Sequence, residues 1–267
     1  MQATKLAFLL SRETESGGGD TFYQFIPYRY GPFSFQLYHE SEKLIKGGCL
    51  RESDENAWSV TNKGMTQADA LQDRIKEEVS FITDRYALFP VSRLLSYVYE
   101  RYPWFTVISK ASKPRQAMPV AEPAVYTVGY EGISVDGLFN HLLEKGIRKV
   151  LDVRRNPVAR RYGFHKRTLA SICEKLEIDY EHLPPLGIDS AKRKTLKTRD
   201  DYMLLLEEYE NSTLIQERDL LNDVSSIMVH TPSSLLCMEA DPDICHRSRI
   251  ASMVSAFTSM PVCHLRP

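Results

Sequence analysis

The sequence predicts an α/β fold for the second part of the chain, with a mainly parallel sheet flanked by helices, and a small helical domain before it. In residues 124–267, short apolar runs typical of buried strands alternate with segments of helical periodicity, as in parallel sheets. In residues 1–108, helical segments predominate. Between them, residues 109–123 contain Pro114 and Pro119 and lack periodic hydrophobicity, so we expect a linker there.

The first domain is expected to contain four helices and one small hairpin. The helices are predicted at residues 4–11, 33–46, 66–86 and 90–101, and the hairpin near residues 58–61. Gly47 and Gly48 are typical of the end of the second helix. Helix, turn, helix and then a two-stranded wing is the element order of a winged-helix domain.

A short motif in this domain adds to that prediction. Residues 27–34 read PYRYGPFS, and GGCLRE follows at residues 47–52 after the expected helix. This pattern resembles a bacterial winged-helix-like module of phage-defence, antitoxin and regulatory proteins, over about residues 1–85. The resemblance implies contact with DNA. The alternative is a helical module that docks a protein partner, because the helix at 33–46 carries only Lys43 and Lys46 as basic residues, few for a recognition helix.

Composition limits the function classes. Of the 267 residues, 43% are hydrophobic and 26% are charged, and the formal net charge is -1, which argues against a protein that wraps nucleic acid over its whole surface. The five cysteines are scattered, and neither a secretory leader nor a long apolar run is evident, so we expect free thiols, a cytoplasmic location and no membrane contact.

The second domain is expected to alternate strands and helices. Strands are predicted at residues 125–130, 149–153, 178–183 and 233–239, and helices at residues 134–146, 166–176, 202–222 and 245–257. Two of the strands stop abruptly at charged side chains. Because the carboxyl ends of parallel strands share one edge of the sheet, we expect these side chains to form one site: Asp152, Arg154, Arg155, Glu239, Cys245, His246 and Arg247.

Several motifs here resemble the bacterial family called domain of unknown function 488 (DUF488). The matching segments are residues 126–130, 152–157, 162–164 with Lys166, 182–187, 236–239 and 245–248. The resemblance covers about residues 124–257. It implies an α/β domain with a cleft lined by these motifs, and no particular activity.

The residues after the second strand are strongly basic. Residues 148–167 hold eight basic side chains against Asp152 alone, a local net charge of +7. Such a concentration at a strand end attracts phosphate groups, and the alternative is an ordinary solvated surface. The expected phosphate ligands are Arg154, Arg155, Arg160, Arg161, Lys166 and Arg247.

Two carboxylates are candidate catalytic groups. Glu239 follows an apolar strand without a neighbouring basic residue, so it has either a partner elsewhere or a raised pKa suited to general acid–base catalysis. Asp152 either takes part in catalysis or pairs with Arg154 or Arg247 to organise the site.

Cys245 and His246 allow three interpretations. A thiol near a helix N-terminus has a lowered pKa, which would suit a nucleophile. Alternatively, the cysteine is buried and His246 and Arg247 bind phosphate. A metal site formed by Cys237, Glu239, Cys245 and His246 is disfavoured because Cys-x7-Cys is an uncommon zinc spacing, so no metal and no cofactor are predicted.

Two tyrosines flank a glycine in the first strand. Gly129 would let a ligand approach the backbone, and Tyr126 and Tyr130 would either stack on a nucleobase or pack in the core.

Together these features predict a protein that binds a phosphate-bearing ligand, a nucleotide or nucleic acid, and that hydrolyses it through Glu239, in a bacterial defence or regulatory setting. The alternatives are a non-enzymatic DNA-binding regulator or ligand sensor, and a thiol enzyme centred on Cys245. A protein partner would bind through the N-terminal module.

Overall fold

The computed structural model describes residues 1–267 except 20–21, 54–56, 112–115, 194–195 and 267. The chain divides into two compact units, Met1–Ala117 and Met118–Pro267, each with its own hydrophobic core. Residues 112–115 of the expected linker lie outside the described residues. No helix of the described part has the length and apolar character needed to span a membrane.

The N-terminal unit is rich in helices and contains two antiparallel hairpins, β1–β2 and β3–β4. Its elements are α1 (Gln2–Glu13), β1 (Ile26–Tyr28), β2 (Gly31–Phe33), α2 (Phe35–Lys46), β3 (Leu50–Glu52), β4 (Trp58–Val60), α3 (Asn62–Asp69), α4 (Asp73–Tyr86), α5 (Val91–Arg101) and the 3-10 turn η1 (Pro103–Thr106). Ser34 caps α2 because its hydroxyl accepts a hydrogen bond from the Leu37 amide.

Two features of this unit differ from the sequence prediction. The long helix expected at 66–86 is two helices, α3 and α4, and the break at residues 70–72 contains neither glycine nor proline to signal it. The β1–β2 hairpin was not predicted, because Pro27 and Pro32 lie within its strands and proline argues against a strand. The winged-helix identity of the unit stays a prediction.

Aromatic side chains dominate the core of the N-terminal unit. Phe8 is fully buried and packs edge-on against Phe25, Tyr102 and Phe105. Such edge-to-face contacts are favourable because the positive ring edge meets the negative ring face.

The C-terminal unit is an α/β domain with a five-stranded sheet in which every pairing is parallel. Its strands are β5 (Val125–Gly129), β6 (Lys149–Asp152), β7 (Asp179–His182), β8 (Ser233–Cys237) and β9 (Val262–Leu265), in the order β7-β6-β8-β5-β9. Its helices are α6 (Val135–Glu144), α7 (Lys166–Lys175), α8 (Arg199–Tyr209), α9 (Arg218–His230) and α10 (His246–Thr258). Shorter turns are η2 (Pro184–Leu186), η3 (Ser190–Arg193), the π-helical turn η4 (Glu210–Leu214) and η5 (Pro242–Ile244). The predicted fold class, a mainly parallel sheet flanked by helices, is confirmed.

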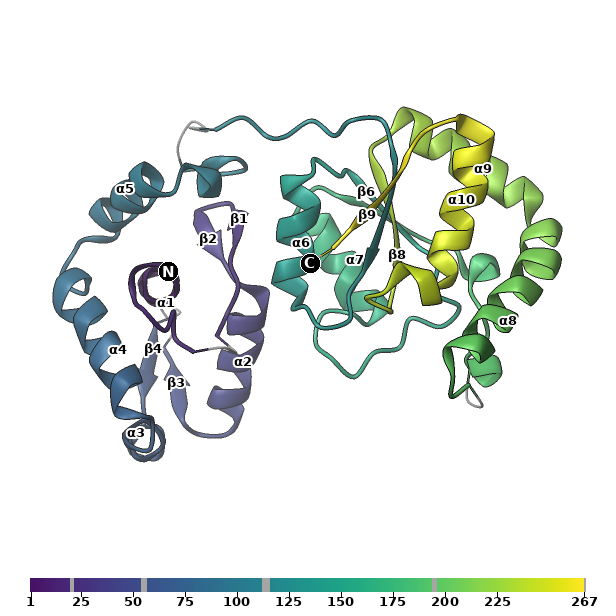
Figure 1. Cartoon of the computed structure of the whole chain (residues 1–267). Helices are drawn as coiled ribbons and strands as arrows, with labels where there is room; N and C mark the ends of the chain where they lie inside the picture. Colours follow the sequence, from purple (N-terminus) through teal and green to yellow (C-terminus); the bar gives the residue numbers. More distant parts are fainter. Residues whose placement is uncertain (20–21, 54–56, 112–115, 194–195, 267) are drawn as a thin grey trace. The chain divides into compact units, whose positions relative to one another are not determined.

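Helices cover both faces of this sheet. Figure 1 shows α6 and α7 on one face, and α8, α9 and α10 on the other. The apolar sides of α8–α10 pack on Leu151 of β6 and Leu235 of β8, which lie side by side and are fully buried. Right-handed crossovers produce this division, because the connections from β5 to β6 and β7 run toward one edge of the sheet, and those from β7 to β8 and β9 run toward the other.

This topology places β6 and β8 next to each other with connections that leave in opposite directions. The register pairs Asp152 with Leu236 and Gly129 with Cys237, so the carboxyl ends of β5, β6 and β8 lie at one edge. Such a switch point is where open α/β sheets place their sites.

Some boundaries differ from those expected. β8 ends at Cys237, so Glu239 lies in the following loop rather than in the strand. The helical region expected at 202–222 is α8, the π-helical turn and α9. The edge strand β9 was not predicted because residues 262–265 form a short run without clear alternation.

Candidate functional site

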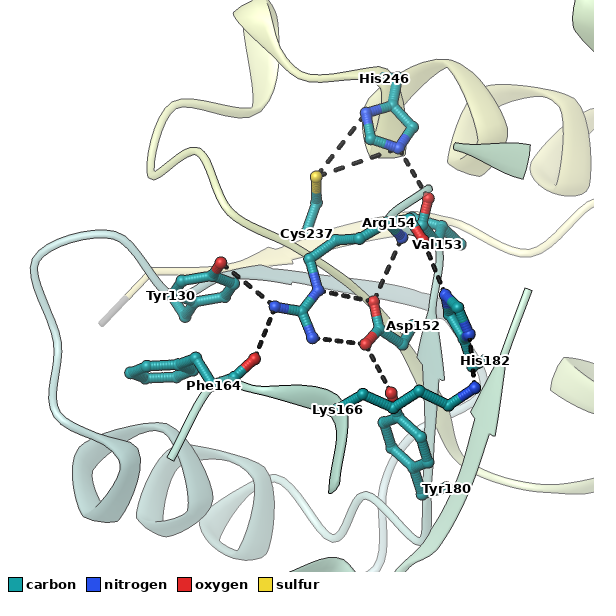
Figure 2. Close-up of polar contacts among 10 residues, drawn as sticks. All are labelled: Tyr130, Asp152, Val153, Arg154, Phe164, Lys166, Tyr180, His182, Cys237 and His246. Carbon is teal, nitrogen blue, oxygen red and sulfur yellow. Dashed lines mark hydrogen bonds and ion pairs between the residues drawn. The ribbon is translucent and has the colours of Figure 1, made fainter. Parts of the chain in front are cut away.

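The carboxyl end of β6 is organised by a buried ion pair between Asp152 and Arg154 (Figure 2). The guanidinium donates through Nε to Oδ1 at 2.7 Å and through a terminal nitrogen to Oδ2 at 2.5 Å. Its other terminal nitrogen donates to the Phe164 carbonyl at 2.9 Å and the Tyr130 hydroxyl at 3.2 Å. Burial disfavours the charged guanidinium, but hydrogen bonding to Asp152 and its negative charge outweigh this and raise the pKa of Arg154.

Arg154 therefore binds acceptor groups of the protein, and its guanidinium is not available to a ligand in this arrangement. Four of its five N–H groups have protein acceptors, and its side chain is 7% exposed. The predicted phosphate-binding role of Arg154 does not fit this geometry. Asp152 follows the organising interpretation, since it also accepts a hydrogen bond from the Tyr180 hydroxyl at 2.6 Å.

A chain of hydrogen bonds connects this pair to the surface. His182, the last residue of β7, lies 2.8 Å through Nε2 from the Arg154 carbonyl oxygen, and its Nδ1 lies 2.9 Å from Lys166 Nζ. A carbonyl only accepts, so Nε2 carries the proton and Nδ1 accepts from the lysine. Figure 2 shows Lys166, His182 and Arg154 in this sequence.

A second cluster lies at the carboxyl end of β8 and the start of α10. Glu239 Oε2 accepts hydrogen bonds from the Cys237 and Cys245 thiols, each at 3.0 Å. His246 Nδ1 lies 3.6 Å from the Cys237 sulfur, and His246 Nε2 lies 3.0 Å from the Val153 carbonyl oxygen (Figure 2). One ligand atom from each of Cys237, Glu239, Cys245 and His246 lies within 4.8 Å of the others, a grouping able to hold a metal ion.

Glu239 has a partner that the sequence did not reveal. Arg193 of η3 donates to Glu239 Oε1 at 2.6 Å and to His246 Nδ1 at 3.1 Å. Burial disfavours the carboxylate, but the charge of Arg193 and the two thiol hydrogen bonds outweigh it and lower the pKa of Glu239 to about 2. Of the two interpretations of Glu239, the structure supports the partnered carboxylate, and a raised pKa is wrong.

The prediction of a lowered pKa for Cys245 is also wrong. Cys245 is the N-cap residue of α10, where the helix dipole favours a thiolate, but it is 1% exposed. Burial and the neighbouring Cys237 thiol raise the pKa of Cys245 well above its usual range. This does not favour Cys245 as the nucleophile of a thiol enzyme.

Arg247 and Gly129 shape the loop that carries Glu239. The guanidinium of Arg247 is buried and donates to the carbonyl oxygens of Glu239 at 2.5 Å and Ala240 at 3.0 Å. A Cβ on Gly129 would lie 1.8 Å from the backbone carbonyl oxygen of Glu239. The missing side chain of Gly129 thus makes room for the protein's own loop rather than for a ligand. The predicted phosphate-binding role of Arg247 does not fit its contacts with carbonyl oxygens.

The two strand tyrosines pack in the core. Tyr126 is 6% exposed and donates to the Glu122 carbonyl, and Tyr130 is 7% exposed and stacks on Phe164 at 4.2 Å between ring centroids. Neither ring has a free face for a nucleobase, so the packing interpretation holds for both.

The other predicted phosphate ligands are exposed: Arg155, Arg160, Arg161 and Lys166. Arg167, which belongs to the same basic stretch but was not predicted as a ligand, is exposed too. We call these five residues the basic surface. In the part of the chain that the structure describes, none of them forms an ion pair with a carboxylate. Arg155 also lines a cavity of about 300 Å³. The other residues lining it are Pro185, Gly187, Ile188, Asp189, Lys192, Leu205, Tyr209, Thr213, Gln216 and Glu217.

Sequence reasoning missed Arg193, Lys192, Tyr180 and His182. The two basic residues lie in the run AKRK at residues 191–194. Its basic composition can be read from the sequence, but the run does not follow an expected strand, which was the signal used to choose site residues. His182 belongs to a motif that the family resemblance used, yet its bond to the Arg154 carbonyl depends on the pairing of β7 with β6.

The C-terminal unit is thus a parallel α/β domain whose charged and thiol groups gather at the carboxyl edge of the sheet. Residues 134–254 match the family model described as "Domain of unknown function DUF488". The C-terminal unit contains a domain of this family, which confirms the resemblance drawn from its motifs. Comparisons with curated proteins and with solved structures find no match.

Proposed function

We propose that the C-terminal unit binds a phosphate-bearing ligand, a nucleotide or nucleic acid, through the basic surface. The observation that carries this proposal is the set of five exposed cationic side chains without a carboxylate partner among the described residues. Most exposed charges on an ordinary protein surface are interspersed with the opposite sign, whereas residues 155–167 contain five cationic side chains and no acidic one.

The position of the basic surface supports the same proposal. Arg155 follows Asp152 at the carboxyl end of β6, next to β8. A Cβ on Gly187 would lie 2.1 Å from the Arg155 amide nitrogen, so the turn after β7 packs closely against the backbone at Arg155. Such packing restrains the start of the basic surface, and a restrained arginine loses less entropy when it binds phosphate.

We favour a polymer over a single nucleotide because the basic side chains extend from residue 155 to residue 167 along the chain, and most lie outside the cavity. A polymer offers successive phosphates to such a surface. Binding would then release counterions and weaken steeply with salt.

The test is a salt titration of the full chain with a fluorescent oligonucleotide, followed by anisotropy. The double variant Arg160→Ala/Arg161→Ala should lower the affinity and reduce the slope of log K against log salt by about one unit for each lost phosphate contact. The control is Lys145→Ala/Arg148→Ala, which removes two exposed charges just before β6, at the other end of the strand, and should leave the slope unchanged.

Two outcomes would contradict the polymer. A salt-independent affinity would exclude phosphate contacts, and full affinity for a mononucleotide with none for any oligonucleotide would assign a small ligand. Hydrolysis is tested separately, because a hydrolase should lose turnover but keep binding when Glu239→Gln is introduced, whereas a regulator or sensor has no turnover.

A further inference from the structure

The cysteine cluster at the start of α10 is separate from the basic surface and has the features of a metal site. Its ligand atoms come from one short stretch of chain: the end of β8, the following loop and the first turn of α10. Cys237, Cys245 and His246 are each 1% exposed. Glu239 is more accessible, with 14% of its side chain exposed.

The distances within this cluster approach those around a tetrahedral ion. Zinc bonds of about 2.3 Å to sulfur and about 2.0–2.1 Å to nitrogen or oxygen place neighbouring ligand atoms about 3.3–3.8 Å apart. Here Glu239 Oε2 lies 3.0 Å from each sulfur, and His246 Nδ1 lies 3.6 Å from the Cys237 sulfur. Movements of less than about 1 Å would bring the donors to those separations.

The histidine already has the tautomer of a metal ligand. The contact of Nε2 with the Val153 carbonyl at 3.0 Å (Figure 2) requires the proton on Nε2, which leaves a lone pair on Nδ1. In this structure the Arg193 guanidinium donates to that nitrogen at 3.1 Å, and the Cys237 sulfur lies 3.6 Å from it. Metal-binding histidines almost always donate their other N–H to a carbonyl or carboxylate in this way, which sets the tautomer and the ring orientation.

A cation already contacts two of the four donors. The Arg193 guanidinium binds His246 Nδ1, which the ion would use, and Glu239 Oε1, the second oxygen of the ligating carboxylate. Arg193 is the last residue of η3, and 26% of its side chain is exposed, so it can turn toward solvent. The cluster therefore provides a position for positive charge that either the arginine or an ion can fill.

We propose that Cys237, Glu239, Cys245 and His246 bind one Zn²⁺ ion in tetrahedral coordination and that Arg193 moves aside when the ion enters. Two thiolates with one imidazole and one carboxylate favour a borderline-soft ion such as Zn²⁺ over Mg²⁺ or Ca²⁺, which prefer oxygen. Each thiol releases its proton to solvent as its zinc–sulfur bond forms, and no oxidation or reduction takes place.

With four protein ligands, the ion has no open position and would act structurally. It would fasten the start of α10 and the loop at residues 238–244 to the end of β8. This inference goes beyond the proposed binding of phosphate, and none of its ligands belongs to the basic surface, so either proposal can fail without the other.

The test uses the full chain, freed of metal by a chelator and kept reduced by a phosphine. Titration with Co²⁺, a spectroscopic substitute for Zn²⁺, should reach one equivalent and produce the visible bands of tetrahedral cobalt together with thiolate-to-cobalt charge transfer. Added Zn²⁺ should displace the cobalt and abolish both signals. Zn²⁺ should also raise the Tm of the reduced chain, because an ion that binds only the folded state stabilises it.

Variants identify the ligands. Cys237→Ser and Cys245→Ser should each weaken Co²⁺ binding and reduce the charge-transfer band, whereas Cys263→Ser, which removes a thiol from β9, should leave both unchanged. Arg193→Ala should tighten Co²⁺ binding, since it removes the competing cation without touching the core. This last result remains informative if a cysteine variant fails to fold.

Two results would overturn the proposal. One is the absence of stoichiometric Co²⁺ or Zn²⁺ binding by the reduced chain. The other is a cobalt spectrum that persists unchanged in the double variant Cys237→Ser/Cys245→Ser.

Discussion

At the residue scale, the C-terminal unit contains a buried ion pair between Asp152 and Arg154. Asp152 is fully buried, and its charge is compatible with that position only because the guanidinium and the Tyr180 hydroxyl both bind it. Removal of one partner from such a pair leaves an uncompensated charge in the core.

We therefore expect Asp152→Asn to destabilise the C-terminal unit by about 3–5 kcal/mol, the usual cost of breaking a buried pair. Urea unfolding followed by far-UV circular dichroism measures it. Lys149→Gln is the control, because Lys149 lies in the same strand and pairs at 2.7 Å with the more exposed Glu181, where a loss below about 1 kcal/mol is expected. Equal losses in both variants would show that the Asp152 pair is not special.

A buried lysine distinguishes the N-terminal unit. Lys5 is 3% exposed, and its ammonium group donates to the Pro32 carbonyl at 2.7 Å. Burial lowers the pKa of Lys5 to about 7, while the unfolded chain keeps the ordinary value near 10.5.

The direction of the pH effect follows from this difference. Below pH 7 Lys5 holds its proton in both the folded and the unfolded state. Between pH 7 and about 10 the unfolded state binds more protons than the folded state. The free energy of unfolding should therefore rise with pH in this range, by up to about 1.4 kcal/mol per pH unit. Urea unfolding at pH 6–9.5, followed by tryptophan fluorescence, reports on this unit because Trp58 and Trp104 both lie in it. Lys5→Met should flatten the rise, and Lys43→Met, at an exposed position of α2, should not. A rise of the same slope in Lys5→Met would exclude Lys5 as its source.

At the scale of single elements, the start of α8 is fixed by a capping box. The Thr198 hydroxyl accepts a hydrogen bond from the Asp201 amide at 3.2 Å, and the Asp201 carboxylate accepts from the Thr198 amide at 2.9 Å. Such reciprocal bonds satisfy amide donors that the first turn of a helix leaves free.

Thr198→Ala should cost about 1 kcal/mol of stability, because one of those donors loses its acceptor. Thermal unfolding followed by circular dichroism is the measurement. Ser252→Ala on α10 is the control, because its exposed hydroxyl only bonds back to the Ser248 carbonyl and its loss should fall within about 0.5 kcal/mol of zero. A Thr198→Ala variant as stable as the control would mean that the cap contributes nothing.

At the scale of the whole molecule, none of the described residues among 109–123, which join the two cores, is buried. The chain divides between Ala117 and Met118, Ala117 is exposed, and Val120 is 89% exposed. Proteases cut where the backbone has few buried contacts.

Limited proteolysis should therefore cut first within residues 109–123 and release two fragments that resist further digestion. Mass spectrometry of the early products identifies the site. Early cleavage within residues 150–250, with residues 109–123 intact, would show that the two units do not behave as separate folding bodies.

The sequence by itself determined the α/β class, the strand that ends at Asp152 and the family of the C-terminal unit. Apolar runs, helical periodicity and short motifs are local properties, so they can be read along the chain. The sequence could also predict that Asp152, Glu239 and His246 lie at one edge, because parallel strands share their carboxyl ends.

Only the tertiary structure decided what each of these side chains does. Arg193 reaches Glu239 from a turn 46 residues away, and Val153 offers the carbonyl that orients His246 across the sheet edge. Burial raises the pKa of Cys245 although the helix dipole would lower it. In the buried site, Arg154 binds the Asp152 carboxylate and Arg247 binds backbone carbonyl oxygens, so neither is directed at a ligand. Contacts and solvent exclusion depend on how distant segments pack, and no local pattern encodes them.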